Sequence, residues 1–439
     1  MEPKDFYEFV VLGAGLSGLS AGHELYKAQA DVVIIEGSHR AGGVIESQVM
    51  EGFTVESGAN SMVLTSEIDA MCEELGISDQ IIPAKEGSKA RQILWDDQLH
   101  TLKASPLALL TTGLISTGAK LRLLKEPFIK SKSPAGESVL DFFTRRFGPQ
   151  VARRMAGAIV SGIYAGDPEK LEMASVFPRF VQLEKKYGSL LKGLFKEKSA
   201  PRQIISFPQG VETLTRALSN ALADHLLYGR ELVSVSRALD HWVLAFKDGS
   251  SLKAKNVIST LPSYAIQEAL RQLEFPALNL AYHPMWTLQV KMDLQEFQQK
   301  TTGFGFLASP YERKDFIGVL YNGNVFDTGI AHDQALMTFF VRPDHCTYKN
   351  SQEILEKVCI PLVKKWTGIN SEIIPVSSRH WPSAIPQKTI GHHLKLQAVN
   401  DWQKHHPHFY IAGNFIYGVS LGDCVKDHQA LAKQVLSTC

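Results

Sequence analysis

The N-terminal residues follow the order strand, glycine-rich turn, helix and strand. The apolar runs 7–12 and 31–35 are of strand type, and Gly13, Gly15 and Gly18 lie between them in the spacing GxGxxG, ahead of a helical run. A βαβ dinucleotide-binding unit requires this order of elements, and the glycine spacing alone would be much weaker evidence. The sequence therefore predicts an α/β fold that begins with a Rossmann-type domain.

The glycines and the helix start have distinct expected roles. Gly13 permits the tight turn, Gly15 lets backbone approach a pyrophosphate, and Gly18 lets the helix pack close to the strand. The N-terminus of the helix, at Leu16 and Ser17, offers N–H groups and the positive end of the helix dipole to phosphates. We therefore expect the pyrophosphate of a dinucleotide at this turn.

The residues after the second strand narrow the choice of cofactor. Glu36 is placed to accept hydrogen bonds from ribose hydroxyls, and Arg40, Gly42 and Gly43 follow it. An arginine followed by paired glycines resembles the extension found in the FAD-binding amine-oxidase superfamily, where the arginine meets the phosphates and the glycines pass near the flavin. The resemblance implies FAD. NAD stays an alternative, because the first βαβ unit alone does not separate the two cofactors.

Size and composition exclude several classes of protein. The 439 residues suffice for two or three domains, and 44% hydrophobic with 21% charged residues is typical of a globular chain. A formal net charge of +1 gives no signal for nucleic-acid binding. The five cysteines form no CxxC pair, which suits a reducing compartment and argues against a zinc site or a disulfide framework. The polar first residues predict no signal peptide, and no run approaches the ~20 apolar residues that span a bilayer.

The composition changes to helical patterns between about residues 104 and 200. The stretch Pro106–Ile115 is apolar, and five basic residues follow it between positions 120 and 132. A second basic run lies between 185 and 198. An apolar stretch beside basic side chains is what contact with a membrane surface requires. The alternative is that the stretch belongs to a core and the lysines to a solvated surface.

Two motifs resemble those of a hydrolase and of a metal site, but their spacing does not support either function. The segment 418–422 matches the GxSxG nucleophile elbow, but the acidic and histidine residues that follow it, within 423–428, share one short helix and cannot form a triad in line. The histidines at 392–393 and 405–408 lack metal-ligand spacing, so we expect solvated loop histidines there. Neither a hydrolase nor a metal site is predicted.

Four further segments resemble the oxygen-dependent protoporphyrinogen oxidases, a family within the amine-oxidase superfamily. One is Trp381-Pro382-Ser383-Ala384-Ile385-Pro386-Gln387 followed by Gly391-His392. The others are 302–307, 161–167 and 413–424, and all four stand in the family's order. The resemblance runs from residue 7 to residue 437.

The resemblance implies a chain of three parts. An FAD-binding domain is assembled from residues 1–91, 204–262 and 401–439. A helical, membrane-associating domain occupies 92–203, and a substrate-binding domain with a mixed sheet occupies 263–400.

Residues that match the family's FAD-binding positions come from all three segments of the FAD-binding domain. Val233 is expected to hold the adenine side through its backbone, and the segment 418–421 is expected at the isoalloxazine ring, where the last helix directs its positive end. The implied cofactor-binding residues are Gly13, Gly15, Leu16, Ser17, Gly18, Glu36, Arg40, Gly42, Gly43, Val233, Gly413, Gly418, Val419, Ser420 and Leu421.

Four residues match the family's substrate contacts. Arg91 is expected to meet a propionate, Phe304 and Leu307 to sandwich a pyrrole ring, and Gly162 to line the other side, where a side chain would block the macrocycle. No catalytic side chain is expected, because the flavin takes a hydride from a meso carbon while a ring N–H releases the proton.

The chain departs from the family at two positions near the expected cavity. The family usually has proline where this chain has Ala59, and it often has a polar residue where this chain has Phe306. The substrate contacts are therefore less firmly implied than the FAD contacts.

The function implied is oxidation of protoporphyrinogen IX to protoporphyrin IX in haem biosynthesis, with dioxygen as acceptor and hydrogen peroxide as by-product. Coproporphyrinogen III oxidation is the first alternative, and it would be favoured by more cationic groups around the cavity, because that substrate has four carboxylates rather than two. A flavin amine oxidase would need an aromatic cage, and a flavin protein retained for partner binding would show no turnover. We expect a cytoplasmic protein with peripheral contact to the inner membrane. The sequence is compatible with either a monomer or a homodimer.

Overall fold

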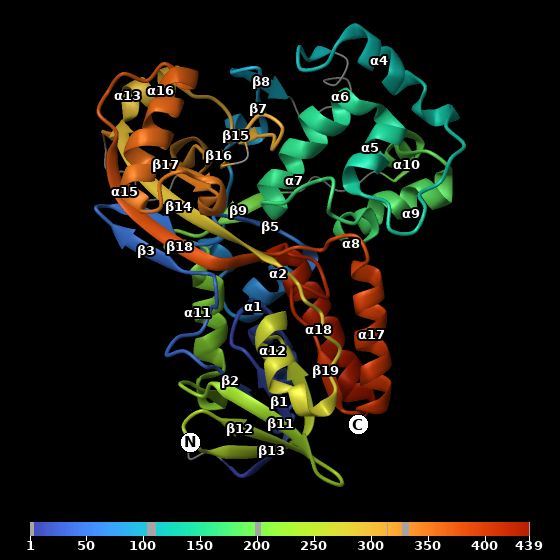
Figure 1. The fold of residues 1–439 in the computed structure, drawn as a ribbon. Helices are drawn as coiled ribbons and strands as arrows, with labels where there is room; N and C mark the ends of the chain where they lie inside the picture. Colours follow the sequence, from blue (N-terminus) through green and yellow to red (C-terminus); the bar gives the residue numbers. More distant parts are fainter. Residues whose placement is uncertain (1–3, 103–110, 198–202, 314, 327–332, 439) are drawn as a thin grey trace.

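The computed structural model describes residues 4–102, 111–197, 203–313, 315–326 and 333–438. One sheet lies at one end of the molecule, and a second sheet lies beside a group of helices at the other end (Figure 1). The first sheet runs in the order β10 (Leu226–Leu227), β2 (Val32–Ile35), β1 (Phe6–Leu12), β13 (Ser251–Ser259), β12 (Trp242–Phe246) and β11 (Leu232–Arg237), with β19 (Phe409–Ile411) paired to β13.

The predicted βαβ unit is confirmed. Strands β1 and β2 are parallel, with Phe9 opposite Val32, and α1 (Leu16–Lys27) connects them. Strands β13 and β19, from distant parts of the chain, extend the sheet in parallel on the other side of β1. The first sheet is therefore built from N-terminal, middle and C-terminal segments.

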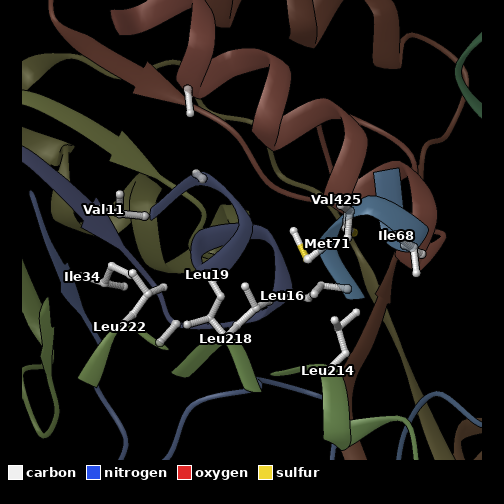
Figure 2. Close-up of a cluster of buried hydrophobic side chains, with 14 of the residues drawn as sticks. Val11, Leu16, Leu19, Ile34, Ile68, Met71, Leu214, Leu218, Leu222 and Val425 are labelled. Carbon is white, nitrogen blue, oxygen red and sulfur yellow. The ribbon is translucent and has the colours of Figure 1, made fainter. Parts of the chain in front are cut away.

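Helices from the same three regions bury one face of this sheet. Side chains of β1, β2 and α1 pack with those of α2 (Ser66–Glu74), α11 (Glu212–Ala221) and α18 (Leu421–Thr438) in one apolar cluster (Figure 2). Leu19 and Ile34 are fully buried there, as is Val425 of α18. This packing fixes the start of α18 relative to the glycine turn that precedes α1.

The second sheet is mixed. Its order is β18 (Ile374–Pro386), β14 (Tyr282–Asp293), β17 (Gln334–Val341), β16 (Phe316–Leu320), β15 (Gly305–Ala308), β7 (Arg91–Trp95) and β8 (Gln98–Leu102). The sequence from Trp95 to Leu99 predicts a hairpin turn between residues 93–94 and 100–102. The structure confirms it, with Trp95 opposite Gln98. Strand β7 pairs in parallel with β15, so β7 and β8 lie in this sheet although the segment 92–203 was assigned to the helical domain.

The rest of the predicted helical domain, as far as residues 111–197 describe it, is mainly helical. It contains α4 (Thr117–Leu124), η3 (Glu126–Phe128), α5 (Val139–Phe147), α7 (Gly157–Tyr164), α9 (Pro178–Tyr187) and α10 (Leu190–Lys196). Leu114 and Ile115 are buried in its core. The prediction that the stretch Pro106–Ile115 contacts a membrane is therefore wrong for these two residues. Residues 106–110 lie outside the described residues. Among the described helices, none is both long and apolar enough to cross a membrane.

Candidate functional site

The glycine turn before α1 has the geometry that a dinucleotide requires. Gly13 has a φ of +97°, which confirms the predicted tight turn. A Cβ on Gly18 would lie 1.8 Å from the carbonyl oxygen of Gly13, so the helix does approach the strand end closely. A Cβ on Gly15 would meet only the Cα of Gly43, at 3.9 Å. A side chain at position 15 would therefore enter the space between the two glycine loops, where we predict that the pyrophosphate binds; we call this space the cradle.

The loop that contains the paired glycines faces this cradle. Gly42 and Gly43 have φ of +103° and +60°, and the Gly42 N–H donates to the carbonyl of Ala14 at 2.8 Å. Arg40 donates to the carbonyls of Ile45 and Gly43, at 3.0 and 2.6 Å. In this structure the guanidinium shapes its own loop, and its contact with phosphates stays a prediction.

Glu36 and Val233 line one cavity of about 560 Å³ at the carboxyl ends of β1 and β2. The Glu36 carboxylate accepts from the N–H groups of Ala14 and Ser38, both at 2.8 Å, which fixes it beside the turn. Val233 lies at a bulge between β11 and β12, where the pairing skips from Leu232 to Ser234. Its backbone is therefore open to a ligand such as an adenine ring.

The segment 413–421 ends at the N-terminus of α18. The Ser420 hydroxyl accepts from the Asp423 N–H at 3.2 Å and donates to its carboxylate at 2.7 Å, so Ser420 caps the helix. His428 is fully buried, and its Nε2 accepts from the Gly413 N–H at 3.0 Å. The serine and histidine of the apparent nucleophile elbow are thus both engaged elsewhere, which agrees with the exclusion of a hydrolase.

The four expected substrate residues line one cavity of about 290 Å³ between the second sheet and α7: Arg91, Gly162, Phe304 and Leu307. The other lining residues are mostly apolar and include the segment Gly58–Ser61. Strands β14 and β18 hold that segment, because Thr287 and Trp381 donate to the Ser57 carbonyl at 2.9 and 2.7 Å. The cavity therefore lies where the second sheet meets the cofactor-binding part.

Arg91 is a partly buried cation at the cavity wall. Its guanidinium lies 3.8 Å above the ring of Phe304 and donates to the Ser88 carbonyl at 2.6 Å. Burial lowers the pKa of Arg91, and it forms no ion pair with a carboxylate in the part of the chain that the structure describes. A cation held this way is suited to the carboxylate of a ligand.

Gly162 and Leu307 are in contact rather than on opposite sides of an open slot. A Cβ on Gly162 would lie 2.7 Å from Leu307 Cδ2. Leu307 must therefore rotate before a wide ring can lie against Gly162. Gly162 lies within α7 and does not have a positive φ; the left-handed residue that ends this helix is Ala165.

Other residues near the cavity were placed incompletely from sequence. Phe306 lines the cavity as expected, and it is also part of the core, because it is 1% exposed and its ring packs on Phe316 and Trp366. Ala59 lines the cavity as expected. Asn60, which sequence reasoning missed, also lines it, with Oδ1 buried and lacking a partner. Its position in a loop that follows a buried strand was the available signal.

A dinucleotide cradle joined to an apolar cavity by a second, mixed sheet defines a cofactor-dependent enzyme of the Rossmann class. The model of the family described as flavin containing amine oxidoreductase matches residues 16–436. The chain belongs to this family. The predicted flavin cofactor and the predicted class of flavin-dependent oxidoreductase are thereby confirmed.

Several curated proteins are similar over nearly the whole chain. Protoporphyrinogen oxidase 2 of Arabidopsis thaliana is 27% identical, with 97% of this chain and 93% of that protein covered. Coproporphyrinogen III oxidase of Bacillus subtilis (strain 168) is 24% identical, with 98% and 97% covered.

Solved structures confirm the fold. A crystal structure from Exiguobacterium sp. 255-15, of a protein provisionally named protoporphyrinogen oxidase, has a TM-score of 0.82, 23% identity and 99% coverage of both chains. A putrescine oxidase with bound putrescine has a TM-score of 0.68, 13% identity and coverage of 99% of this chain and 100% of that chain.

Proposed function

We propose that the protein is an FAD-dependent oxidase that converts protoporphyrinogen IX to protoporphyrin IX in haem biosynthesis, with dioxygen as acceptor. Six hydrogens leave the substrate as three two-electron oxidations, and three dioxygen molecules become three hydrogen peroxide. The observation that carries the proposal is the apolar cavity with Arg91 on its wall. The full-length relatives that are named porphyrinogen oxidases support it.

The charge at the cavity separates this proposal from an amine oxidase. Arg91 would repel an alkylammonium substrate, whereas it would attract a propionate. Among the described residues that line the cavity, Arg91 is the only charged one. This favours a substrate with few carboxylates at the wall. Coproporphyrinogen III, with four carboxylates, is the second candidate because a relative of that name matches the whole chain.

The residues of the chain bind and orient the substrate, while a bound flavin would accept the hydride. Arg91 fixes one propionate, and Phe304, stacked on its guanidinium, is kept in one orientation. The apolar lining excludes water from the reacting face. The Asn60 Oδ1, which lacks a partner, can accept a hydrogen bond from a pyrrole N–H.

We assign the flavin ring to the segment 418–421 and the adenine end to Val233, as the family resemblance implies. The cofactor-binding part then consists of 1–91, 204–262 and 401–439, and the residues 263–400 hold the substrate.

Membrane contact is proposed for a surface formed by α4, η3 and α10. We call it the α4–α10 surface. Helices α4 and α10 both contact η3, and Phe128 and Phe195 are 81% and 67% exposed there. The exposed basic residues of this surface are Lys125, Lys192 and Lys196. Exposed aromatic side chains beside lysines suit the interface of an anionic membrane.

Aerobic incubation of the FAD-loaded protein with each porphyrinogen tests the proposal. We expect porphyrin fluorescence to rise faster with protoporphyrinogen IX than with coproporphyrinogen III, and hydrogen peroxide to form in step. A faster rise with coproporphyrinogen III would transfer the assignment to the second candidate. Peroxide formed from putrescine but from neither porphyrinogen would reject both.

A further inference from the structure

Lys388 is a buried lysine next to the segment that we assign to the flavin ring. It lies between β18 and α17 (His392–His405), and it is 3% exposed. Its ammonium donates to the carbonyl oxygen of Tyr417, directly before Gly418. No described carboxylate forms an ion pair with Lys388. A buried ammonium without a paired anion leaves its charge to act on its surroundings.

The turn that contains Lys388 is fixed from two sides. The Glu172 N–H donates to the Lys388 carbonyl at 2.9 Å, and the Glu172 carboxylate accepts from the Gly391 N–H at 3.2 Å. The buried ring of His392 bonds to the Phe415 carbonyl at 2.9 Å. Lys388 and His392 thus bond to the carbonyl groups of Tyr417 and Phe415, which belong to the loop before α18. The ammonium of Lys388 therefore has a defined position beside this loop.

The charged and titratable groups around Lys388 are few. Asp423, Cys424 and Asp427 face it from α18, and His392 faces it from its own turn. Burial lowers the pKa of Lys388 to about 8, although these three α18 groups oppose the shift. Burial also lowers the pKa of His392, which is neutral near pH 7. Lys388 is therefore mostly charged at pH 7 and mostly neutral at pH 9.

We propose that Lys388 is a positioning residue: its ammonium places a positive charge beside the loop that contains the segment 418–421, to which we assign the flavin ring. The site then binds reduced flavin more tightly than oxidised flavin. Two-electron reduction with uptake of one proton leaves a net negative charge on a flavin ring. The Lys388 ammonium and the positive end of α18 converge on the same loop and favour that charge. The inference rests on the assignment of the flavin ring under the proposed function.

Three substitutions separate the charge from the hydrogen bond. Lys388→Gln keeps a donor for the Tyr417 carbonyl without the charge, Lys388→Met removes both, and Lys388→Arg keeps the charge. Lys404→Met is the control, because Lys404 lies at the far end of α17 with its side chain 72% exposed. The readout is the midpoint potential of bound FAD, measured by equilibration with a reference dye, together with FAD content and melting temperature.

We expect Lys388→Gln and Lys388→Met to lose roughly tenfold of the preference for reduced flavin, which corresponds to a potential lower by about 30 mV. Lys388→Arg and Lys404→Met should keep the wild-type potential. An unchanged potential in Lys388→Gln and Lys388→Met, with a lower melting temperature, would overturn the proposal and leave Lys388 a structural role.

The wild-type protein provides a test that needs no substitution. Because Lys388 loses its proton near pH 8, the potential should fall more steeply between pH 7 and 9 in the wild type than in Lys388→Gln. Parallel pH profiles would contradict the inference. A wild-type protein that binds FAD and oxidises porphyrinogens but shows parallel profiles would reject only this inference, whereas failure to bind FAD would reject the proposed function as well.

Discussion

At the scale of single residues, Gly15 and Gly18 differ in what surrounds an added methyl group. Gly15 has a φ of −70°, and a Cβ there would make one ordinary contact, with the Gly43 Cα at 3.9 Å, whereas a Cβ on Gly18 would overlap the Gly13 carbonyl oxygen. We expect Gly15→Ala to lose FAD while the stability of the apoprotein changes by less than about 1 kcal/mol. Gly18→Ala should lower stability by about 1–3 kcal/mol. FAD content and melting temperature distinguish the two; retention of FAD by Gly15→Ala would contradict the cradle.

Removal of the Arg91 guanidinium tests the carboxylate contact. Loss of one charge-assisted hydrogen bond costs about 1.5–3 kcal/mol, so Arg91→Ala should raise KM roughly 10- to 150-fold while FAD stays bound. Lys89→Ala is the matched control, because the Lys89 side chain is 68% exposed and pairs with Glu86 on the surface. Equal kinetics for the two variants would remove Arg91 from the site.

The contact between Gly162 and Leu307 gives a paired test of the cavity. In Gly162→Ala the methyl group would push Leu307 into the cavity, so we expect turnover to fall with little change in FAD content. Leu307→Ala should recover part of that loss in the double variant, since it vacates the space. Wild-type kinetics in Gly162→Ala with a lower melting temperature would mean that the position matters only for packing.

Single residues were predictable where the cause is local. The glycine spacing before α1 and the acid after β2 follow from the steric and hydrogen-bonding needs of one turn. His392 was expected to be a solvated loop residue, which is wrong: it is 1% exposed and bonds to Phe415, 23 positions away. The burial of Lys388 depends in the same way on a segment distant in sequence, so no local pattern indicated it.

At the scale of elements, local pairing was predictable and sheet membership was not. The hairpin of β7 and β8 turns at Trp95 to Gln98, within one short stretch of sequence. Its place in the second sheet depends on pairing with β15, about two hundred residues later, which no periodicity reveals. Leu114 and Ile115 were predicted to contact a membrane because they are apolar, but they are buried in a core. Apolar character alone does not distinguish a membrane contact from a core.

The α4–α10 surface provides a prediction at this scale. Phe128→Ser and Phe195→Ser should each weaken binding to anionic vesicles roughly tenfold, because each removes an exposed ring that could enter the bilayer interface. Sedimentation with vesicles measures the effect. Leu239→Ser is the control, since Leu239 is fully exposed in the turn between β11 and β12 of the first sheet. Equal loss in the control, or no binding by the wild type, would reject the surface.

At the scale of the whole molecule, buried titratable groups set the response to acid. Burial lowers the pKa of His392 and His428 to about 4, so the unfolded state binds more protons between pH 6.5 and 4, and stability is lost as pH falls through that window. Burial raises the pKa of Glu56 to about 7, which opposes the loss between pH 7 and 4.5. Taken together, these two histidines outweigh Glu56, so the three groups leave a net loss of stability on acidification.

His428→Gln isolates one of these protons. The amide can accept from the Gly413 N–H and donate to the Cys424 carbonyl, as the neutral imidazole does. We expect the slope of unfolding free energy against pH, between pH 6.5 and 4, to fall by about 1.4 kcal/mol per pH unit relative to the wild type. Denaturant titrations at several pH values measure it. An unchanged slope would mean that His428 does not titrate with folding.

Anaerobic mixing of the FAD-loaded protein with protoporphyrinogen IX tests the central claim most directly, because it joins the cofactor cradle to the substrate cavity in one reaction. We predict that the flavin absorbance bleaches within a turnover time, that porphyrin fluorescence appears, and that admission of dioxygen restores the flavin colour. Flavin that stays oxidised with both porphyrinogens but bleaches with putrescine would contradict the account.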